Sequence, residues 1–132
     1  MAVATVGDSA ELSLAVSGDT ITDFAGVVGD DNPIHTDPAY AAETMFGGEI
    51  AHGMLVASVV SGALARLPGD VIYLSQDLRF ENPVRPGETV TAEVTVTEDL
   101  GDDRLRVTTV AATDDGTVLS GEAVVLSVPH GT

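Results

Sequence analysis

Cysteine, lysine and tryptophan are absent from this chain of 132 residues. Without cysteine the chain can form no disulfide, no cysteine-ligated metal site and no cysteine nucleophile. It also lacks the roughly 18 consecutive apolar residues that a membrane-spanning helix needs. Its first residues carry neither the basic nor the apolar segment of a secretory signal, so we expect a cytoplasmic protein.

Positive charge is scarce, because five arginines stand against 21 acidic residues and give a formal net charge of -16 at pH 7. Such a chain lacks the cations that contact phosphate, which argues against nucleic-acid binding. An acidic, lysine-free composition also suits a cytoplasm at molar salt, where charges are screened within about 3 Å. We therefore predict a salt-adapted protein, as from a halophile; an ordinary acidic protein is the alternative.

Hydrophobic residues make up 44% of the chain, enough for a core in one domain over residues 1–132. In residues 11–17 apolar and polar side chains alternate, with Leu12, Leu14 and Val16 on one face, and this predicts a half-buried strand. Four more runs of strand-forming residues follow residue 70 with short turns between them. Short connections indicate antiparallel neighbours.

The longest helical segment covers residues 53–67, and its only polar interior residues are Ser58 and Ser61. A helix that is apolar all round is buried rather than laid on a surface. Only a sheet that curls around this helix could cover every side of it. We therefore predict an α+β domain in which an antiparallel five-stranded sheet wraps around a central long α-helix.

Two shorter helical pieces precede the long helix. The first is expected from Thr20, whose hydroxyl can cap it, to about Gly29. The second begins with Asp37 as the capping residue and a proline at the first helical position. Residues 30–35 between them are expected to form a loop, because Pro33 cannot continue a helix.

The stretch from Phe24 to His35 is the one place where acid–base residues crowd against apolar residues on both sides. It sets the Asp30 carboxylate and the His35 imidazole five residues apart around Asn32-Pro33. A carboxylate and a histidine near apolar surface can have shifted pKa values, and such pairs are candidate general acids and bases. The same residues are ordinary turn formers, so a solvated turn is the alternative.

The segment from Gly47 to Met54 leads into the long helix. Free backbone N–H groups at a helix start, together with the helix dipole, form a site for developing negative charge. Gly53 has no side chain, so a substrate carbonyl could approach its backbone closely. A carboxylate, an imidazole and such a site together suit the addition or removal of water next to a carbonyl.

Four segments carry a resemblance to a known family. They are residues 24–41 with Gly29-Asp30-x-Asn32-Pro33-Ile34-His35, Ala51-His52-Gly53-Met54 with Ser61 downstream, Ile72-Tyr73-Leu74 and the turn from Phe80 to Glu88. Together they resemble the MaoC-like (R)-specific enoyl-CoA hydratases, in particular the small bacterial enzymes of polyhydroxyalkanoate supply, and the first segment is similar to the hydratase-2 signature. The resemblance covers nearly the whole chain. It implies a hot-dog fold that pairs edge to edge into a homodimer.

The resemblance also assigns roles. The family's catalytic dyad falls on Asp30 and His35, while Asp31 occupies a variable position. The implied reaction is syn hydration of a trans-2-enoyl thioester to a (3R)-3-hydroxyacyl product. One group takes a proton from water and the other supplies one to the α-carbon, and the sequence leaves open which does which. The family's oxyanion donor falls on the Gly53 N–H, and its active-site serine falls on Ser61. A bond from Ser61 to a carbonyl one turn earlier is an equal alternative.

Three residues are assigned to substrate binding: Asn32, which would orient the loop or the water, Met54, and Arg85. The expected coenzyme A thioester is polyanionic and the chain is anionic, so either arginines cluster at the entrance or high salt screens the repulsion. Arg104 and Arg106 are further candidates, with ordinary surface pairing as their alternative.

No cofactor and no metal are expected. His35 and His52 lack the spacing of paired ligands and cysteine is absent, which disfavours zinc. His52 is instead expected to shape the turn into the long helix.

Three rival functions remain open from the sequence. The first is a related dehydratase acting on a branched or dicarboxylic acyl-CoA or on a carrier-protein thioester. The second is a hot-dog acyl-CoA thioesterase, which would not need the Asp-Asn-Pro-His loop. The third is a non-catalytic acyl-binding subunit, against which the intact dyad argues.

Overall fold

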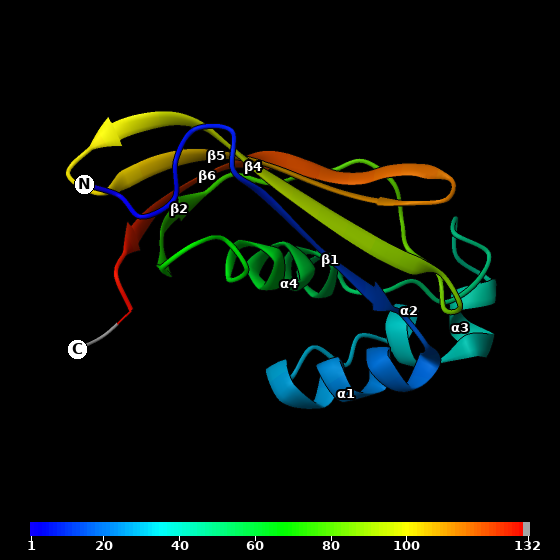
Figure 1. Ribbon diagram of the computed structural model, residues 1–132. Helices are drawn as coiled ribbons and strands as arrows, with labels where there is room; N and C mark the ends of the chain where they lie inside the picture. The colour runs from blue at the N-terminus through cyan, green and yellow to red at the C-terminus, as the bar shows by residue number, and fades with distance from the viewer. Residues whose placement is uncertain (131–132) are drawn as a thin grey trace.

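An antiparallel sheet packs along one side of a central helix, and three shorter helices lie beyond the helix and at one end of the sheet (Figure 1). The computed structural model describes residues 1–130. The elements in chain order are β1 (Ser9–Ala15), α1 (Gly18–Val28), α2 (Pro33–Thr36), α3 (Pro38–Ala42), α4 (Gly53–Leu64), β2 (Asp70–Gln76), β3 (Arg79–Phe80), β4 (Thr89–Gly101), β5 (Arg104–Thr113) and β6 (Gly116–Val128).

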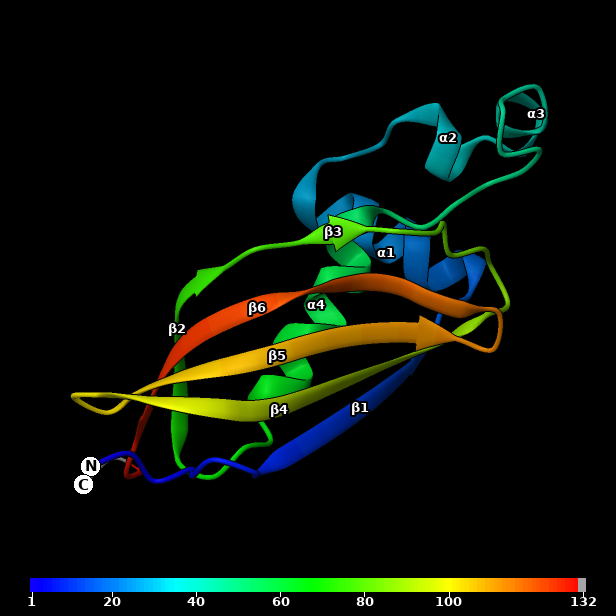
Figure 2. The same cartoon turned by 90° about the horizontal axis from the view of Figure 1, so that it is seen from above.

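The sheet has the strand order β1-β4-β5-β6-β2, and every neighbouring pair is antiparallel. Viewed from above, its strands cross over α4 (Figure 2). The predicted antiparallel sheet is confirmed, but it has six strands rather than five, because β3 also pairs with β6. The first of the four runs expected after residue 70 is therefore two strands, β2 and β3.

The break between β2 and β3 has a local cause. Asp77 bonds to Glu122 of β6 twice, through its backbone N–H and its carboxylate. Its carbonyl oxygen lies so close to Gly121 that a Cβ there would collide with main-chain atoms. Because only a glycine fits at position 121 of β6, the neighbouring chain can kink at Asp77. It then continues into β3, which carries Phe80.

The core lies between the sheet and α4. Alternate residues of β4 are buried, including Val90, Val94 and Val96, as their period of two predicts. On α4 the buried side chains include Leu55, Val59 and Val60. Burying this apolar surface, at about 25 cal/mol for each Å², is the main source of stability for the fold.

One side of α4 is not covered by any part of residues 1–130, so the prediction of a helix buried on all sides is wrong. Met54 is 58% exposed, and Ser58, Ser61 and Ala65 are exposed as well. These four residues are spaced three or four apart and therefore form one stripe along the helix. The sheet covers the opposite side only.

The ends of the short helices differ in detail from the expected ones. Ser17 rather than Thr20 caps α1: the Thr20 N–H donates to the Ser17 hydroxyl at 3.1 Å. Asp37 caps α3 as predicted, accepting from the Tyr40 N–H at 3.1 Å. The expected loop ends early, because Pro33 begins α2, where its missing N–H costs nothing.

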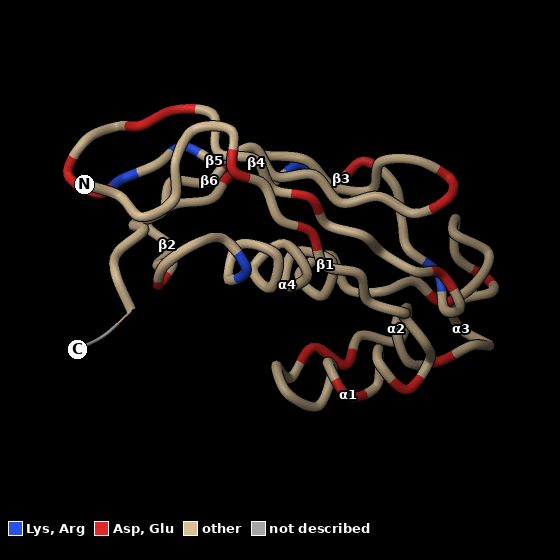
Figure 3. The backbone as a smooth tube through the Cα atoms, viewed as in Figure 1, with Lys and Arg blue, Asp and Glu red and all other residues tan. Residues whose placement is uncertain are grey.

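Acidic residues are spread over the strands, α1 and the connecting loops, whereas arginines are few and scattered (Figure 3). No helix within residues 1–130 is both long enough and apolar enough to cross a membrane.

Candidate active site

Asp30 follows the left-handed Gly29 that ends α1, and its side chain is 42% exposed. One carboxylate oxygen, Oδ1, accepts a hydrogen bond from the Asn32 side-chain amide at 2.6 Å and a longer one from the Asn32 backbone N–H. The bond from the Asn32 amide is the main reason that the pKa of Asp30 lies below its ordinary value, against a smaller opposing effect of burial. Asp30 is therefore an ionised acceptor at neutral pH.

His35 lies in α2, and its side chain is 11% exposed. Its Nδ1 is 2.8 Å from the carbonyl oxygen of Ile50. A carbonyl only accepts, so Nδ1 carries the proton, and in the neutral ring Nε2 holds the lone pair. That Nε2 faces Oδ2 of Asp30 at 3.9 Å. The two groups of the predicted dyad thus point at one another across a short gap.

His52 is the site residue that the sequence interpretation missed, since it was assigned only to the turn before the long helix. It is 2% exposed, and its Nε2 lies 2.7 Å from the backbone carbonyl oxygen of Asp30. Its ring stacks on the ring of His35 with the centroids 3.9 Å apart. It also contacts the ring of Phe24, with the centroids 4.9 Å apart. The signal available in the sequence was its place immediately before Gly53.

The start of α4 faces the same region. His52 is the N-cap residue but makes no side-chain capping bond, and the first N–H groups of a helix have no acceptor within the helix. An ideal Cβ on Gly53 would lie 2.8 Å from Cε1 of Phe80. The Gly53 backbone is thus accessible only because the residue has no side chain.

An apolar cleft connects these groups. A cavity of about 590 Å³ is lined by Asp30, His52 and Gly53 together with Phe24, Val28, Met54 and Phe80. Three of these residues, Phe24, Val28 and Met54, also line a second cavity of about 550 Å³ that reaches Ser61, Tyr73 and Leu78. The cleft therefore extends from Asp30 and the start of α4 along the open stripe of α4.

Ser61 lies in this second cavity rather than beside the dyad. It comes eight residues after Gly53, which is about 12 Å along a helix axis. Ser58 makes the back-bond to a carbonyl, at 2.5 Å to Leu55, and within residues 1–130 no such bond involves the Ser61 hydroxyl. Two polar side chains, Tyr73 and Gln76, also line this cavity. Burial raises the pKa of Tyr73, whose hydroxyl donates to the Gln76 side chain at 2.9 Å.

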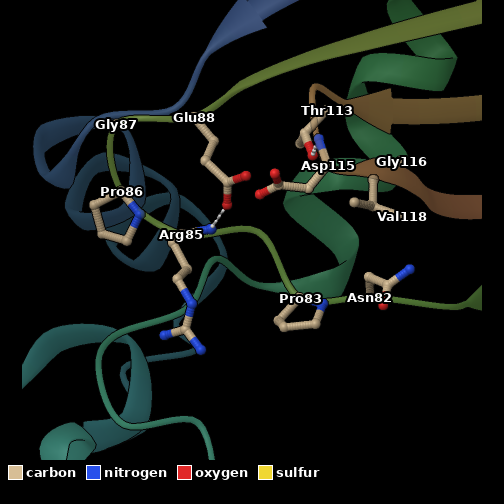
Figure 4. Close-up of a pocket in the computed structure, with 10 residues that line it drawn as sticks. All are labelled: Asn82, Pro83, Arg85, Pro86, Gly87, Glu88, Thr113, Asp115, Gly116 and Val118. Atoms are coloured by element: carbon tan, nitrogen blue, oxygen red, sulfur yellow. Dashed lines mark hydrogen bonds between the residues drawn. The ribbon is translucent and has the colours of Figure 1, made fainter.

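Arg85 and Pro83 both line a separate surface hollow (Figure 4). The Arg85 guanidinium points away from the carboxylates of Glu88 and Asp115 and donates to the carbonyl of Phe46 at 2.5 Å. A guanidinium has five N–H donors, so this bond leaves others for a ligand. Phe46 and Pro83 in turn line a small cavity that reaches Gly53, which connects the hollow with the start of α4.

Arg104 and Arg106 are not part of this region, and their candidacy as substrate-binding residues is withdrawn. They lie at the start of β5, next to the β4–β5 turn and at the end of the sheet remote from α2 and α3 (Figures 1 and 2). Arg106 pairs with Glu98 at 2.9 Å and with Glu122 at 3.7 Å. For Arg106 the alternative of ordinary surface pairing is what the structure shows.

Asp30, His35 and His52 each offer a ligand atom, and these atoms lie within 4.8 Å of one another. His52 has already committed Nε2 to a carbonyl. The two stacked rings also hold their in-plane lone pairs in nearly parallel planes, which disfavours both of them ligating one ion. The arrangement therefore suits proton transfer better than metal binding.

A family model described as MaoC like domain matches residues 3–118. The chain belongs to the MaoC-like family. Among its relatives, the (R)-specific enoyl-CoA hydratase of Aeromonas caviae is 46% identical over 125 residues, which are 91% of this chain and 92% of the relative. The (R)-specific enoyl-CoA hydratase of Rhodospirillum rubrum is 43% identical over 128 residues, or 95% of this chain and 89% of the relative.

A solved MaoC-like structure agrees with the fold. The unliganded R-hydratase of Pseudomonas aeruginosa is 38% identical and has a TM-score of 0.88, with 97% of this chain and 87% of that chain covered. The predicted hot-dog fold is thereby confirmed, as is the family that the four sequence segments indicated.

Proposed function

We propose that this MaoC-like chain is an (R)-specific enoyl-CoA hydratase, a lyase that reversibly adds water to trans-2-enoyl-CoA to give (3R)-3-hydroxyacyl-CoA. The observation that carries the proposal is the pair of acceptors, His35 Nε2 and Asp30 Oδ2, that face each other at 3.9 Å beside the uncapped start of α4. Two of the relatives that match nearly the whole chain carry this activity in their names.

A water molecule that donates one hydrogen to each acceptor is held between His35 and Asp30. As its oxygen attacks the β-carbon, His35 Nε2 takes its proton, and the bond from Nδ1 to the Ile50 carbonyl keeps the lone pair on Nε2. Ionised Asp30 orients the water and stabilises the imidazolium that forms. The imidazolium then returns this proton to the α-carbon. The water oxygen and the proton thus add to the same face, which is syn addition.

Charge that builds up on the thioester oxygen needs a donor in the transition state. The Gly53 N–H is suited to this, since it heads α4 where the helix dipole is positive and has no partner within the helix. Loss of one such donor typically costs 10²- to 10³-fold in kcat, roughly 2.7–4 kcal/mol. Gly53 thus acts through its backbone, and the catalytic set is Asp30, His35 and Gly53.

We place the acyl chain and the coenzyme A arm of the substrate at opposite ends of the cleft. The acyl chain lies along Met54 and the open stripe of α4 toward Ser61, because that cavity is mainly apolar. The coenzyme A arm leaves past Phe80 and Pro83 toward Arg85, the cation beside the connecting cavity. Ser61 therefore contacts the acyl chain in this proposal, and it does not take part in the proton transfers.

A homodimer would complete the site. Within residues 1–130, β2 pairs only with β6, so its other edge is free, and Ile72, Tyr73 and Leu74 on this strand are exposed large side chains. An exposed apolar edge strand invites pairing with another chain. Joining two β2 edges around a two-fold axis would extend the sheet and cover the open stripe of α4 with the partner.

The expected cytoplasmic location stays a prediction.

The test is hydration of crotonyl-CoA in molar KCl, followed by loss of the enoyl-thioester absorbance and by chiral analysis of the product. Asp30→Asn and His35→Ala should each lower kcat by about 10²- to 10⁴-fold, the usual contribution of a positioned acid or base. Asp31→Asn and His130→Ala are matched controls, because they remove the same side-chain types outside the dyad. Full activity of either dyad variant, or a (3S) product, would overturn the proposal.

The rival functions are separated by the same preparation. A thioesterase would release free thiol from acyl-CoA, which a thiol reagent detects, whereas a hydratase leaves the thioester intact. A panel of branched, dicarboxylic and carrier-bound thioesters then distinguishes a related dehydratase, which would use the same dyad on a different acyl group.

A further inference from the structure

We propose that His52 is a positioning residue for this reaction: it holds the Asp30 loop and the His35 ring in their reactive arrangement and takes no part in the proton transfers. The inference rests on the proposed hydratase function. It is argued from three contacts of one buried side chain, with Asp30, with His35 and with Phe24.

The first contact fixes the loop that carries Asp30. Among the hydrogen bonds within residues 1–130, only the one from His52 Nε2 to the Asp30 carbonyl joins residues 29–32 to any residue outside 25–36. The other bonds of this loop are local, such as that between Asn32 and Asp30. The distance from the Asp30 carboxylate to the rest of the site therefore depends on His52.

The second contact fixes the ring of His35. Besides its covalent attachment, the imidazole is held by one hydrogen bond, from Nδ1 to the Ile50 carbonyl, and a single bond still permits some rotation of the ring about Cβ–Cγ. His52 stacks on its face with an interplanar angle of 24°, and Phe24 packs against His52 from its own side at 55°. The layer Phe24–His52–His35 blocks the rotation and keeps Nε2 directed at Asp30.

The third observation concerns the nitrogen that is left over. The Asp30 carbonyl can only accept, so His52 carries its proton on Nε2, and Nδ1 is buried with no hydrogen-bond partner among residues 1–130. An unpartnered polar atom in the core is unfavourable, which marks a position where another requirement prevails. That requirement is a flat ring with a donor at its far edge: phenylalanine supplies only the ring and glutamine only the donor.

The two half-replacements make the test. His52→Phe keeps the stack and loses the bond to Asp30, whereas His52→Gln keeps an amide donor at a similar reach and loses the stack. Because misplacing a catalytic group by about 1 Å costs up to about 10²-fold, we expect His52→Phe to lower kcat about 10- to 100-fold with KM changed less than about twofold. His52→Gln should lose less than His52→Phe, and the exposed His130→Gln is the matched control.

Folding is checked by circular dichroism and thermal melting of each variant. Wild-type kcat in a folded His52→Phe, or equal losses in both variants with a parallel rise in KM, would overturn the inference. If His52→Phe does not fold, His52→Gln decides: kcat within about fivefold of wild type supports the donor role, and a loss of 10²-fold or more contradicts it.

A measurement without activity separates this inference from the proposed function. Nitrogen-15 correlation spectra of the wild-type protein should show His52 as the Nε2–H tautomer and His35 as the Nδ1–H tautomer. The opposite tautomer at His52 would refute the inference even in an active hydratase. An inactive wild type with the expected tautomers would instead refute the hydratase proposal.

Discussion

Replacing Gly53 by alanine tests whether the start of α4 receives the thioester oxygen. A Cβ there would lie 2.8, 3.1 and 3.3 Å from three ring atoms of Phe80, which is closer than packed carbon atoms approach each other. Phe80 is 55% exposed and sits on a strand of two residues, so its ring can turn away. Alanine is also a better helix former than glycine. We therefore expect the free energy of unfolding to change by less than about 1 kcal/mol.

The effect on catalysis should be much larger. The new methyl group and the displaced Phe80 ring both stand where the substrate oxygen must approach the Gly53 N–H. Losing that single donor predicts a fall in kcat/KM of about 10²- to 10³-fold, which corresponds to roughly 2.7–4 kcal/mol at 1.36 kcal/mol for each factor of ten.

The assay is kcat/KM for crotonyl-CoA in Gly53→Ala, Phe80→Ala and the double variant, with thermal melts to confirm folding. If crowding by Phe80 contributes, the double variant recovers part of the loss, and the two changes are not additive. Wild-type kcat/KM in a folded Gly53→Ala would refute the assignment of the oxyanion donor to this backbone.

Three further predictions follow from the charges. Asn32→Ala removes the bond that most depresses the pKa of Asp30; that pKa should rise, so that Asp30 protonates at higher pH, with the carboxyl carbon-13 titration as the measurement and Asn82→Ala as the control. Arg85→Ala should raise KM by up to about fivefold with kcat little changed, Arg66→Ala being the control, and an unchanged KM would remove Arg85 from the site. The net charge of -16 predicts a melting temperature that rises from about 0.05 M to about 2 M KCl; a flat curve would contradict salt adaptation.

Local patterns in the sequence were enough for most of the architecture. The period-two pattern of β4 and the proline after Asp37 depend on neighbours in the chain, and both predictions are confirmed. The site residues Asp30 and His35 were identifiable because both belong to one motif of seven residues, Gly29 to His35. The Ser17 cap was missed because Thr20, three residues later, is also an accepted capping residue by local rules, although serine ranks above threonine.

What the sequence could not supply were facts about contacts between distant segments. The bond from His52 to the Asp30 carbonyl spans 22 residues, and no local pattern specifies it. The open stripe of α4 was missed for a different reason. Apolar composition predicts that a surface is covered, but it does not say whether the cover comes from the same chain or from another.

Gly121 illustrates how a residue remote from the chemistry can control the substrate cleft. The collision that a side chain at this position would cause is with the main chain of Asp77, which cannot rotate aside as a phenylalanine ring can. Any larger residue must therefore shift Asp77 and, three residues later, Phe80, the side chain that stands over the start of α4. Position 121 on the sheet should consequently tolerate substitution less than many positions that line the cleft, and the shape of the cleft is fixed in part from the strand behind it.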